Sequence, residues 1–194
     1  MRLQNRVAII TGAASGQGRS IALLFAREGA HVVAADANLA GANETARLAR
    51  EQGAVNIVAA QVDVSSEEAM SRLVEETVST FGGVDILVNC AGRTGPGGKP
   101  TADLLTKEEW YRTLDVNLIG PWLGTKYAAP RMRERGGGVI VNVASTAGIR
   151  PFPGASPYCV SKAGLLMLTK TTALEYVSWG IRVVAICPGH IDTP

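Results

Sequence analysis

Short apolar runs recur along the chain, each rich in valine, isoleucine and alanine and with little polar alternation. Runs of this kind are typical of strands that are buried on both faces, as in a parallel sheet. Longer segments with spaced apolar positions separate them. The expected strands are Val7 to Thr11, His31 to Asp36, Asn56 to Gln61, Asp85 to Asn89, Val139 to Ala144 and Arg182 to Cys187.

The segments between these strands are expected to be helical. Gln17 to Glu28 and Ser66 to Phe81 carry spaced apolar positions with charges between them. The segment Glu108 to Arg135 is apolar on several sides and is interrupted by Pro121 and Pro130. We therefore expect it to be buried on more than one face, and a partner subunit is one candidate for the protein that buries it. The alternation predicts a single α/β domain over the 194 residues, a Rossmann-type, doubly wound parallel sheet of six strands with helices on both faces.

Glycine is in excess, at 22 of 194 residues, a share above the usual level of about 7%. The glycines show no three-residue period and the chain is rich in apolar residues, which excludes a collagenous or disordered chain. Many lie between a predicted helix and the next strand, where a positive φ ends a helix. The glycines expected in this role are Gly29, Gly53, Gly82, Gly83, Gly136 to Gly138 and Gly180.

The charge pattern narrows the classes of function. The formal net charge is +2 and the basic residues are scattered among acids, so nothing favours nucleic acid as a partner. No apolar run approaches the roughly 18 residues that a membrane helix needs, which gives no reason to expect a membrane protein. The chain has three cysteines and no CxxC pair, and its N-terminus has no signal-peptide pattern. We therefore expect a cytoplasmic protein. We expect no metal in its site.

A glycine-rich turn, Thr11 to Arg19, follows the first predicted strand. The backbone amides of such a turn and the N-terminus of the following helix bind anions. Gly12 would allow the tight turn, while Gly16 and Gly18 would allow a pyrophosphate and the helix to approach closely. Taken alone, the pattern also fits an ordinary strand-to-helix turn.

Asp36, at the end of the second predicted strand, favours a dinucleotide site. A carboxylate there can accept hydrogen bonds from the hydroxyls of an adenosine ribose. It would repel a 2′-phosphate, and the neighbouring Ser15 and Ala37 supply no positive charge, so we expect NAD rather than NADP. The alternative role for Asp36 is to cap the next helix.

Tyr158 and Lys162 are four residues apart and would share one face of a helix. A free tyrosine has a pKa of about 10 and is a poor base, but a nearby ammonium and an oxidised nicotinamide would favour its phenolate. The pair could then exchange a proton with an alcohol or carbonyl. Ser145 follows the fifth predicted strand at the edge where such sheets bind ligands, and its hydroxyl could hold the substrate oxygen. The alternatives are a surface Tyr–Lys pair and a turn serine.

These motifs together resemble those of the classical short-chain dehydrogenases and reductases. Thr11, Gly12, Gly16 and Gly18 match the family's TGxxxGxG, and the resemblance runs from residue 6 to the last residue. Ser145 and Tyr158 have the family's serine-to-tyrosine spacing. The resemblance implies a catalytic tetrad of Asn117, Ser145, Tyr158 and Lys162, in which Asn117 holds a water that links Lys162 to solvent.

The resemblance also implies further cofactor contacts. Asp63 and Val64 match an adenine-contacting pair, and Pro188 to Thr193 matches the PGxxxT segment beside the nicotinamide. Cys90 stands where the family's NNAG has its second asparagine, and we expect it to be a small buried filler; His190 lies at a variable position. The cofactor-binding residues implied are Gly12, Ser15, Gly16, Gln17, Gly18, Asp36, Asp63, Val64, Asn89, Ala91, Gly92, Tyr158, Lys162, Pro188, Gly189, Ile191 and Thr193.

The implied reaction is a reversible hydride transfer between a nicotinamide and a secondary alcohol or ketone. Tyr158 would move the proton, Ser145 would position the oxygen, and Lys162 would bind ribose hydroxyls. The alternatives are an epimerase or dehydratase of the wider superfamily, and a nucleotide-binding regulatory or structural protein with little turnover. In each case the partner is a small molecule.

Members of the family normally continue past PGxxxT into a substrate lid and a seventh strand, whereas this sequence stops at Pro194. We therefore expect the lid and the last strand to be absent, and most of the substrate specificity with them. Arg93 to Pro100 and Ile149 to Pro153 are expected to line part of the pocket. The helix with Tyr158 and the stretch Glu108 to Arg135 resemble the family's dimer surface, which implies a homodimer or homotetramer; one-sided packing on the sheet is the alternative.

Overall fold

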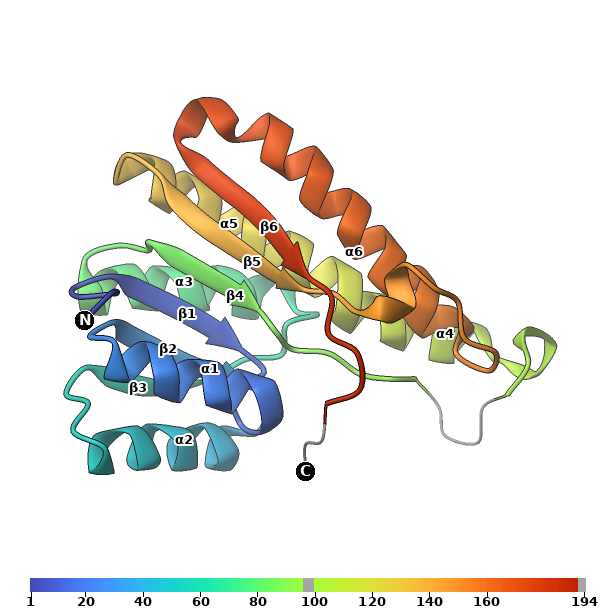
Figure 1. The fold of residues 1–194 in the computed structure, drawn as a ribbon, viewed down its shortest axis with the longest axis horizontal. Coiled ribbons are helices and arrows are strands. Elements are labelled where there is room, and N and C mark those ends of the chain that lie inside the picture. The colour runs from blue at the N-terminus through green and yellow to red at the C-terminus, as the bar shows by residue number, and fades with distance from the viewer. Residues whose placement is uncertain (96–99, 192–194) are drawn as a thin grey trace.

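The computed structural model describes residues 1–95 and 100–191. In these ranges six strands form one sheet in the order β3-β2-β1-β4-β5-β6, and every neighbouring pair is parallel (Figure 1). All six predicted strands are present, and where an end differs from the prediction it differs by one residue. The strands are β1 Val7–Thr11, β2 His31–Asp36, β3 Ile57–Gln61, β4 Ile86–Asn89, β5 Gly138–Val143 and β6 Ile181–Ile186.

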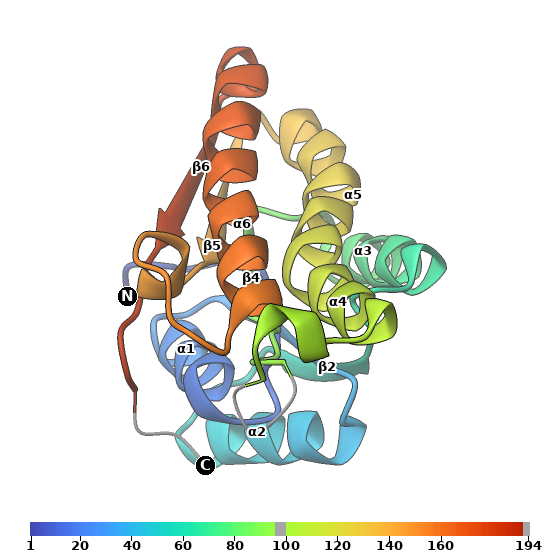
Figure 2. The same ribbon diagram turned by 90° about the vertical axis from the view of Figure 1, so that its right-hand side faces the viewer.

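Helices cover both faces of this sheet, which confirms the Rossmann-type α/β fold. The helices α1 and α2 lie on one face, and α3, α5 and α6 lie on the other (Figures 1 and 2). The long helices are α1 Gly16–Arg27, α2 Leu39–Glu51, α3 Glu67–Phe81, α4 Lys107–Leu114, α5 Gly120–Glu134 and α6 Ser156–Glu175. Short 3-10 turns span Ala102–Leu104, Thr146–Gly148 and Val177–Trp179.

Each face of the sheet has its own hydrophobic core, which explains why the strands lack polar alternation. Ile9 and Val33 point into the core beneath α3 and α5. Ala8 and Val32, their neighbours along the chain, point into the core beneath α1 and α2. Because successive side chains of a strand point to opposite faces, a strand between two helical layers needs apolar residues at every position.

The predicted helix Glu108 to Arg135 is helical throughout, but it changes its hydrogen-bond pattern in the middle. Between α4 and α5, residues Asp115–Ile119 form a π-helical turn. The Gly120 amide donates to the carbonyl of Asp115, five residues back, and Pro121 has no amide hydrogen to donate at all. Turns of this kind are rare and are often found at functional sites, and this one contains Asn117.

The glycines expected to end helices have positive φ, with the exception of Gly138. Gly138 is the first residue of β5. A Cβ at this position would lie 2.6 Å from the sulfur of Met132 and 2.9 Å from the carbonyl oxygen of Asp85. Gly138 is therefore needed for the close packing of α5 against the sheet rather than for a left-handed backbone.

Asp85, just before β4, joins three segments at the edge of the sheet opposite to that of Asp36 and Asn89. Its carboxylate accepts a hydrogen bond from the Val7 amide at 2.8 Å and forms ion pairs of 3.2 Å with Arg6 and Arg135. Burial acts to raise the pKa of Asp85, but the Val7 amide and the two arginines outweigh it, so the pKa is lowered overall.

No helix in the described ranges has the length and apolar character to cross a membrane.

Candidate active site

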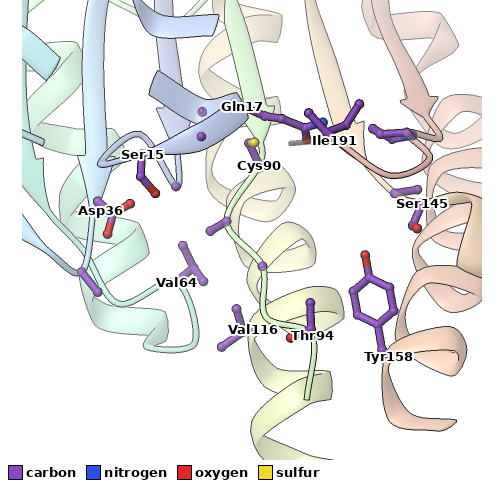
Figure 3. A pocket seen from close by; sticks show the side chains of 18 of the residues that line it. Ser15, Gln17, Asp36, Val64, Cys90, Thr94, Val116, Ser145, Tyr158 and Ile191 are labelled. Atoms are coloured by element: carbon purple, nitrogen blue, oxygen red, sulfur yellow. The ribbon is translucent and has the colours of Figure 1, made fainter. Parts of the chain in front are cut away.

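A cavity of about 600 Å³ opens at the carboxyl ends of the strands, where the strand order reverses on either side of β1. This is the place where open α/β sheets bind ligands. Asp36 and Ser15 lie at one end of the cavity, and Ser145 and Tyr158 lie at the other (Figure 3). The predicted site residues that line it are Gly12, Ser15, Gly16, Gln17, Gly18, Asp36, Asp63, Val64, Ala91, Gly92, Ser145, Tyr158, Pro188, Gly189 and Ile191.

At Gly12 and Gly18 the glycine-rich turn brings backbone to the wall of the cavity, and Ser15 and Gln17 add their side chains (Figure 3). Gly12 has a φ of 71°, and a Cβ there would lie 2.8 Å from the backbone of Ala91. A Cβ at Gly18 would lie 2.0 Å from the carbonyl oxygen of Gly12, so α1 can approach the turn only with glycine at this position. No side chain caps α1 at Ser15. The N-terminus of α1 therefore presents its amides and its positive dipole end to the cavity.

The Asp36 carboxylate is held by two backbone amides at the cavity wall. One oxygen accepts from Ala14 at 3.0 Å and the other from Asn38 at 2.9 Å. Asn38 itself caps α2 by accepting from the Gly41 amide, so capping α2 is not the role of Asp36. Arg19 binds the carbonyl of Ala14 but does not line the cavity. The charged side chains among the described lining residues are thus two carboxylates, the fixed Asp36 and Asp63.

Ser145 and Tyr158 bring two hydroxyl groups together at the other end of the cavity. Ser145 follows β5, is 9% exposed, and accepts a hydrogen bond from the Ala147 amide at 3.0 Å. Tyr158 is in the first turns of α6, and its hydroxyl points toward Ser145 (Figure 3). Both hydroxyls can therefore reach one oxygen atom of a bound molecule.

Lys162 lies behind Tyr158, one helical turn along α6. It is only 4% exposed, and its ammonium donates to the carbonyl of Val143 at 2.7 Å. The nitrogen is 5.8 Å from the centre of the Tyr158 ring. Burial lowers the pKa of Lys162 from its ordinary 10.5 to about 8. Lys162 does not line the cavity, although it is predicted to bind the cofactor.

Asn117 joins the site through the π-turn and is fully buried. Its carboxamide nitrogen donates to the carbonyl of Arg93 at 2.9 Å and to the hydroxyl of Ser161 at 3.0 Å. Its oxygen accepts from the Arg93 amide at 2.8 Å. A Cβ at Gly92 would lie 3.4 Å from the Asn117 oxygen and 3.6 Å from the Lys162 nitrogen. Glycine at this position keeps open the space between these two groups.

Asn89 is predicted to bind the cofactor, but it does not line the cavity. It is 2% exposed, and its carboxamide donates to the side-chain oxygen of Asn142 at 2.8 Å and to the carbonyl of Pro121 at 3.4 Å. Asn142 in turn donates to Thr169 of α6 at 2.9 Å. In this structure Asn89 links the ends of β4 and β5 to α5 and α6.

Several other expectations differ from the structure or lie outside its described part. None of residues 149–153 lines the cavity, and Ile149 and Phe152 are exposed. Thr94 is the lining residue from the loop that begins at Arg93, and residues 96–99 lie outside the described ranges. Thr193 also lies outside them. His190 is exposed and does not line the cavity.

Sequence reasoning missed part of the lining. The additional residues are Ala37, Val62, Cys90, Val116 and Ala144. Ala37, Val62 and Ala144 directly follow strands, and that position is a usable signal. Val116 carries none, because it enters through the π-turn. Burial raises the pKa of Cys90 to about 11, and the nearby Lys162 charge offsets only part of this, so the thiol is protonated at neutral pH.

Comparisons with known proteins identify the family of this chain. The family model for short chain dehydrogenases matches residues 6–194. A 2-(R)-hydroxypropyl-CoM dehydrogenase of Xanthobacter autotrophicus is 40% identical over 190 residues, covering 98% of this chain and 76% of that protein. A cyclohexanol dehydrogenase of Acinetobacter sp. is 39% identical, covering 100% and 76%. The solved structure of levodione reductase superposes with a TM-score of 0.96 at 36% identity, covering 100% of this chain and 74% of that one. The chain belongs to the short-chain dehydrogenase family, whose members are oxidoreductases that use nicotinamide cofactors and act on CH–OH groups.

Proposed function

We propose that this protein is an NAD-dependent dehydrogenase of secondary alcohols that also reduces the corresponding ketones. The observation that carries the proposal is one continuous cavity with a fixed carboxylate, Asp36, at one end and the paired hydroxyls of Ser145 and Tyr158 at the other. A dinucleotide that binds with its adenosine ribose on Asp36 brings its nicotinamide toward those hydroxyls.

The residues of the cavity fit such a cofactor. The turn at Gly12 and Gly18 has no room for a Cβ, and the amides at the start of α1 suit a pyrophosphate. Asp63 and Val64 line the adenosine side of the cavity, and Pro188 lines the catalytic side. When bound, the nicotinamide supplies the hydride acceptor or donor.

The proposed choice of NAD over NADP depends on Asp36. Both carboxylate oxygens already accept one backbone amide each, and each oxygen keeps a second lone pair for a ribose hydroxyl. A 2′-phosphate at the same place would put two negative groups in contact, and Ala37, the next residue along the cavity wall, carries no charge.

The proton steps are assigned to this chain's own side chains. Ser145 donates a hydrogen bond to the substrate oxygen and holds it beside Tyr158. Tyr158 accepts the alcohol proton during oxidation and returns it during reduction. Lys162 stabilises negative charge on the Tyr158 oxygen from a buried position, where its charge is poorly screened.

We further propose that protons reach Tyr158 from solvent through Lys162 and Asn117. The Asn117 oxygen uses one of its two lone pairs on the Arg93 amide, so the other is free for a water. The gap beside Gly92 separates this oxygen from the Lys162 ammonium. A water in that gap would contact both groups and pass protons between Lys162 and the solvent.

A homodimer or homotetramer is the proposed assembly. Large apolar side chains are exposed along α5 and α6, among them Trp122, Val160, Met167 and Leu174, the last at 79% exposure. Exposed apolar side chains along neighbouring helices are typical of a protein–protein interface. Sedimentation of the purified chain over a concentration series tests this proposal, and a monomer at every concentration would contradict it.

The activity test uses the purified chain with NAD or NADP and a panel of secondary alcohols that includes cyclohexanol. We expect NADH absorbance to rise with at least one alcohol and kcat/KM to favour NAD. Tight NADH binding without turnover over a broad panel would instead favour a regulatory nucleotide-binding protein. A large preference for NADP would contradict the role given to Asp36.

A further inference from the structure

The hydroxyl of Ser161 lies in the interior between Asn117 and the helix that carries Tyr158 and Lys162. Ser161 is fully buried. Its oxygen accepts from the Asn117 carboxamide at 3.0 Å, and its hydrogen is donated to the carbonyl of Tyr158 at 2.7 Å. Ser161 thus directly links the π-turn to the first turns of α6.

This contact completes the hydrogen bonding of the Asn117 carboxamide nitrogen. A carboxamide has two N–H groups, and here one is donated to the Arg93 carbonyl and the other to Ser161. Because Asn117 is fully buried, an N–H without a partner at this place would be costly. Ser161 therefore satisfies the second N–H, and the Asn117 oxygen, which accepts from the Arg93 amide, keeps its other lone pair free.

We infer that Ser161 is a positioning residue of the catalytic site, which fixes the Asn117 carboxamide relative to the turn of α6 that carries Tyr158 and Lys162. It touches neither the cavity nor a bound substrate, so it acts through Asn117. The inference rests on the proposed function, since it presumes that Asn117 takes part in the proton path.

The consequence concerns the rate rather than cofactor binding. Ser161 lies between Tyr158 and Lys162 in sequence, and its two hydrogen bonds set how this turn sits on the π-turn. Small errors in the placement of reacting groups lower rates by large factors. The cofactor cradle, formed by the turn at Gly12 and by Asp36, is built from other elements and should be unaffected.

The test is a double-mutant cycle in the full chain. Ser161→Ala is expected to lower kcat about tenfold while the KM for NAD stays unchanged. In an Asn117→Ala background, Ser161→Ala should cause no further loss, because residues that act as one unit are not additive. Thr172→Val is the matched control: it removes another buried hydroxyl of α6, one that bonds only within the helix, and it should leave kcat unchanged.

The outcomes separate this inference from the proposed function. An additive loss in the Asn117→Ala background, or a wild-type kcat for Ser161→Ala, would overturn the role of Ser161 alone. An unchanged kcat for Asn117→Ala itself would overturn both the proton path and this inference.

Discussion

Lys162 shows how one buried side chain connects catalysis with stability. Its ammonium is nearly inaccessible to water and has the Val143 carbonyl as its hydrogen-bond acceptor. The same burial that brings the charge close to Tyr158 lowers the pKa of Lys162 to about 8. The folded protein therefore carries an energetic cost, which we attribute to the role proposed for Lys162 in the reaction.

Removing that charge should stabilise the protein and abolish its activity. We expect Lys162→Met to raise the free energy of unfolding at pH 7 by about 1–3 kcal/mol. At pH 7 both folded and unfolded chains hold the proton, so the cost is complete. Between pH 8 and 10.5 the folded protein binds fewer protons than the unfolded one, so wild-type stability rises and the advantage of the variant shrinks. Urea denaturation at pH 7 and pH 9.5 measures this, and a variant less stable than wild type at pH 7 would contradict it.

Glycine is required at position 18 and at position 53 for different reasons. Substitution by alanine should therefore affect NADH binding at Gly18 and stability at Gly53. A Cβ at Gly18 would lie 2.0 Å from the Gly12 carbonyl oxygen, so Gly18→Ala must move α1 away from the turn. We expect it to weaken NADH binding at least tenfold, as measured by fluorescence titration. Gly53 has a φ of 90° and nothing within 4 Å of a Cβ, so Gly53→Ala should cost about 1 kcal/mol of stability with unchanged NADH binding. Equal binding by both variants would contradict this account.

The secondary structure elements were predictable to different degrees. The strands have apolar residues at every position because both faces are covered, and their pattern alone locates them. The π-turn between α4 and α5 was not predictable, because the apolar pattern of this segment is that of an ordinary helix and the partners of Asn117, Arg93 and Ser161, are far away in sequence. Ser161 was missed for the same reason, since its position in α6 is that of an ordinary helical serine.

Asp85 ties β1 and the end of α5 to β4, and its removal should weaken the sheet at this edge. We expect Asp85→Asn to lower the free energy of unfolding at pH 7 by about 2 kcal/mol. Because the pKa of Asp85 is lowered in the folded state, its contribution is present above its ordinary pKa of 3.8 and is lost as the pH falls through the folded value. The difference between the wild type and the variant should therefore be smaller at pH 3 than at pH 7.

Glu44 provides the control for Asp85. It pairs with Arg47 on an exposed surface of α2, so Glu44→Gln should leave stability unchanged. Urea denaturation of wild type and both variants at pH 7 and pH 3 gives the comparison. A loss for Asp85→Asn that does not depend on pH would argue against the ion pairs as its cause.

The whole molecule brings the site together at one edge of the sheet. Thr11, Asp36 and Ser145 are each at or just beyond the end of a different parallel strand, so their convergence follows from the fold once the strands are located. Tyr158 lies at the same edge because α6, which carries it, packs against the sheet there. The sequence could not show that Asn89 is turned into the interior toward Asn142, nor that Val116 reaches the cavity. Both depend on packing between elements rather than on position in a strand.

The central claim is that Tyr158 transfers the proton while other residues hold the cofactor, and Tyr158→Phe tests it most directly. The substitution removes only the hydroxyl, so NADH should bind with an unchanged Kd while kcat for the best alcohol falls a hundredfold or more, roughly the contribution of a general acid–base. His190→Ala, at an exposed residue outside the cavity, should match the wild type in both measurements. Wild-type turnover by Tyr158→Phe would contradict the account.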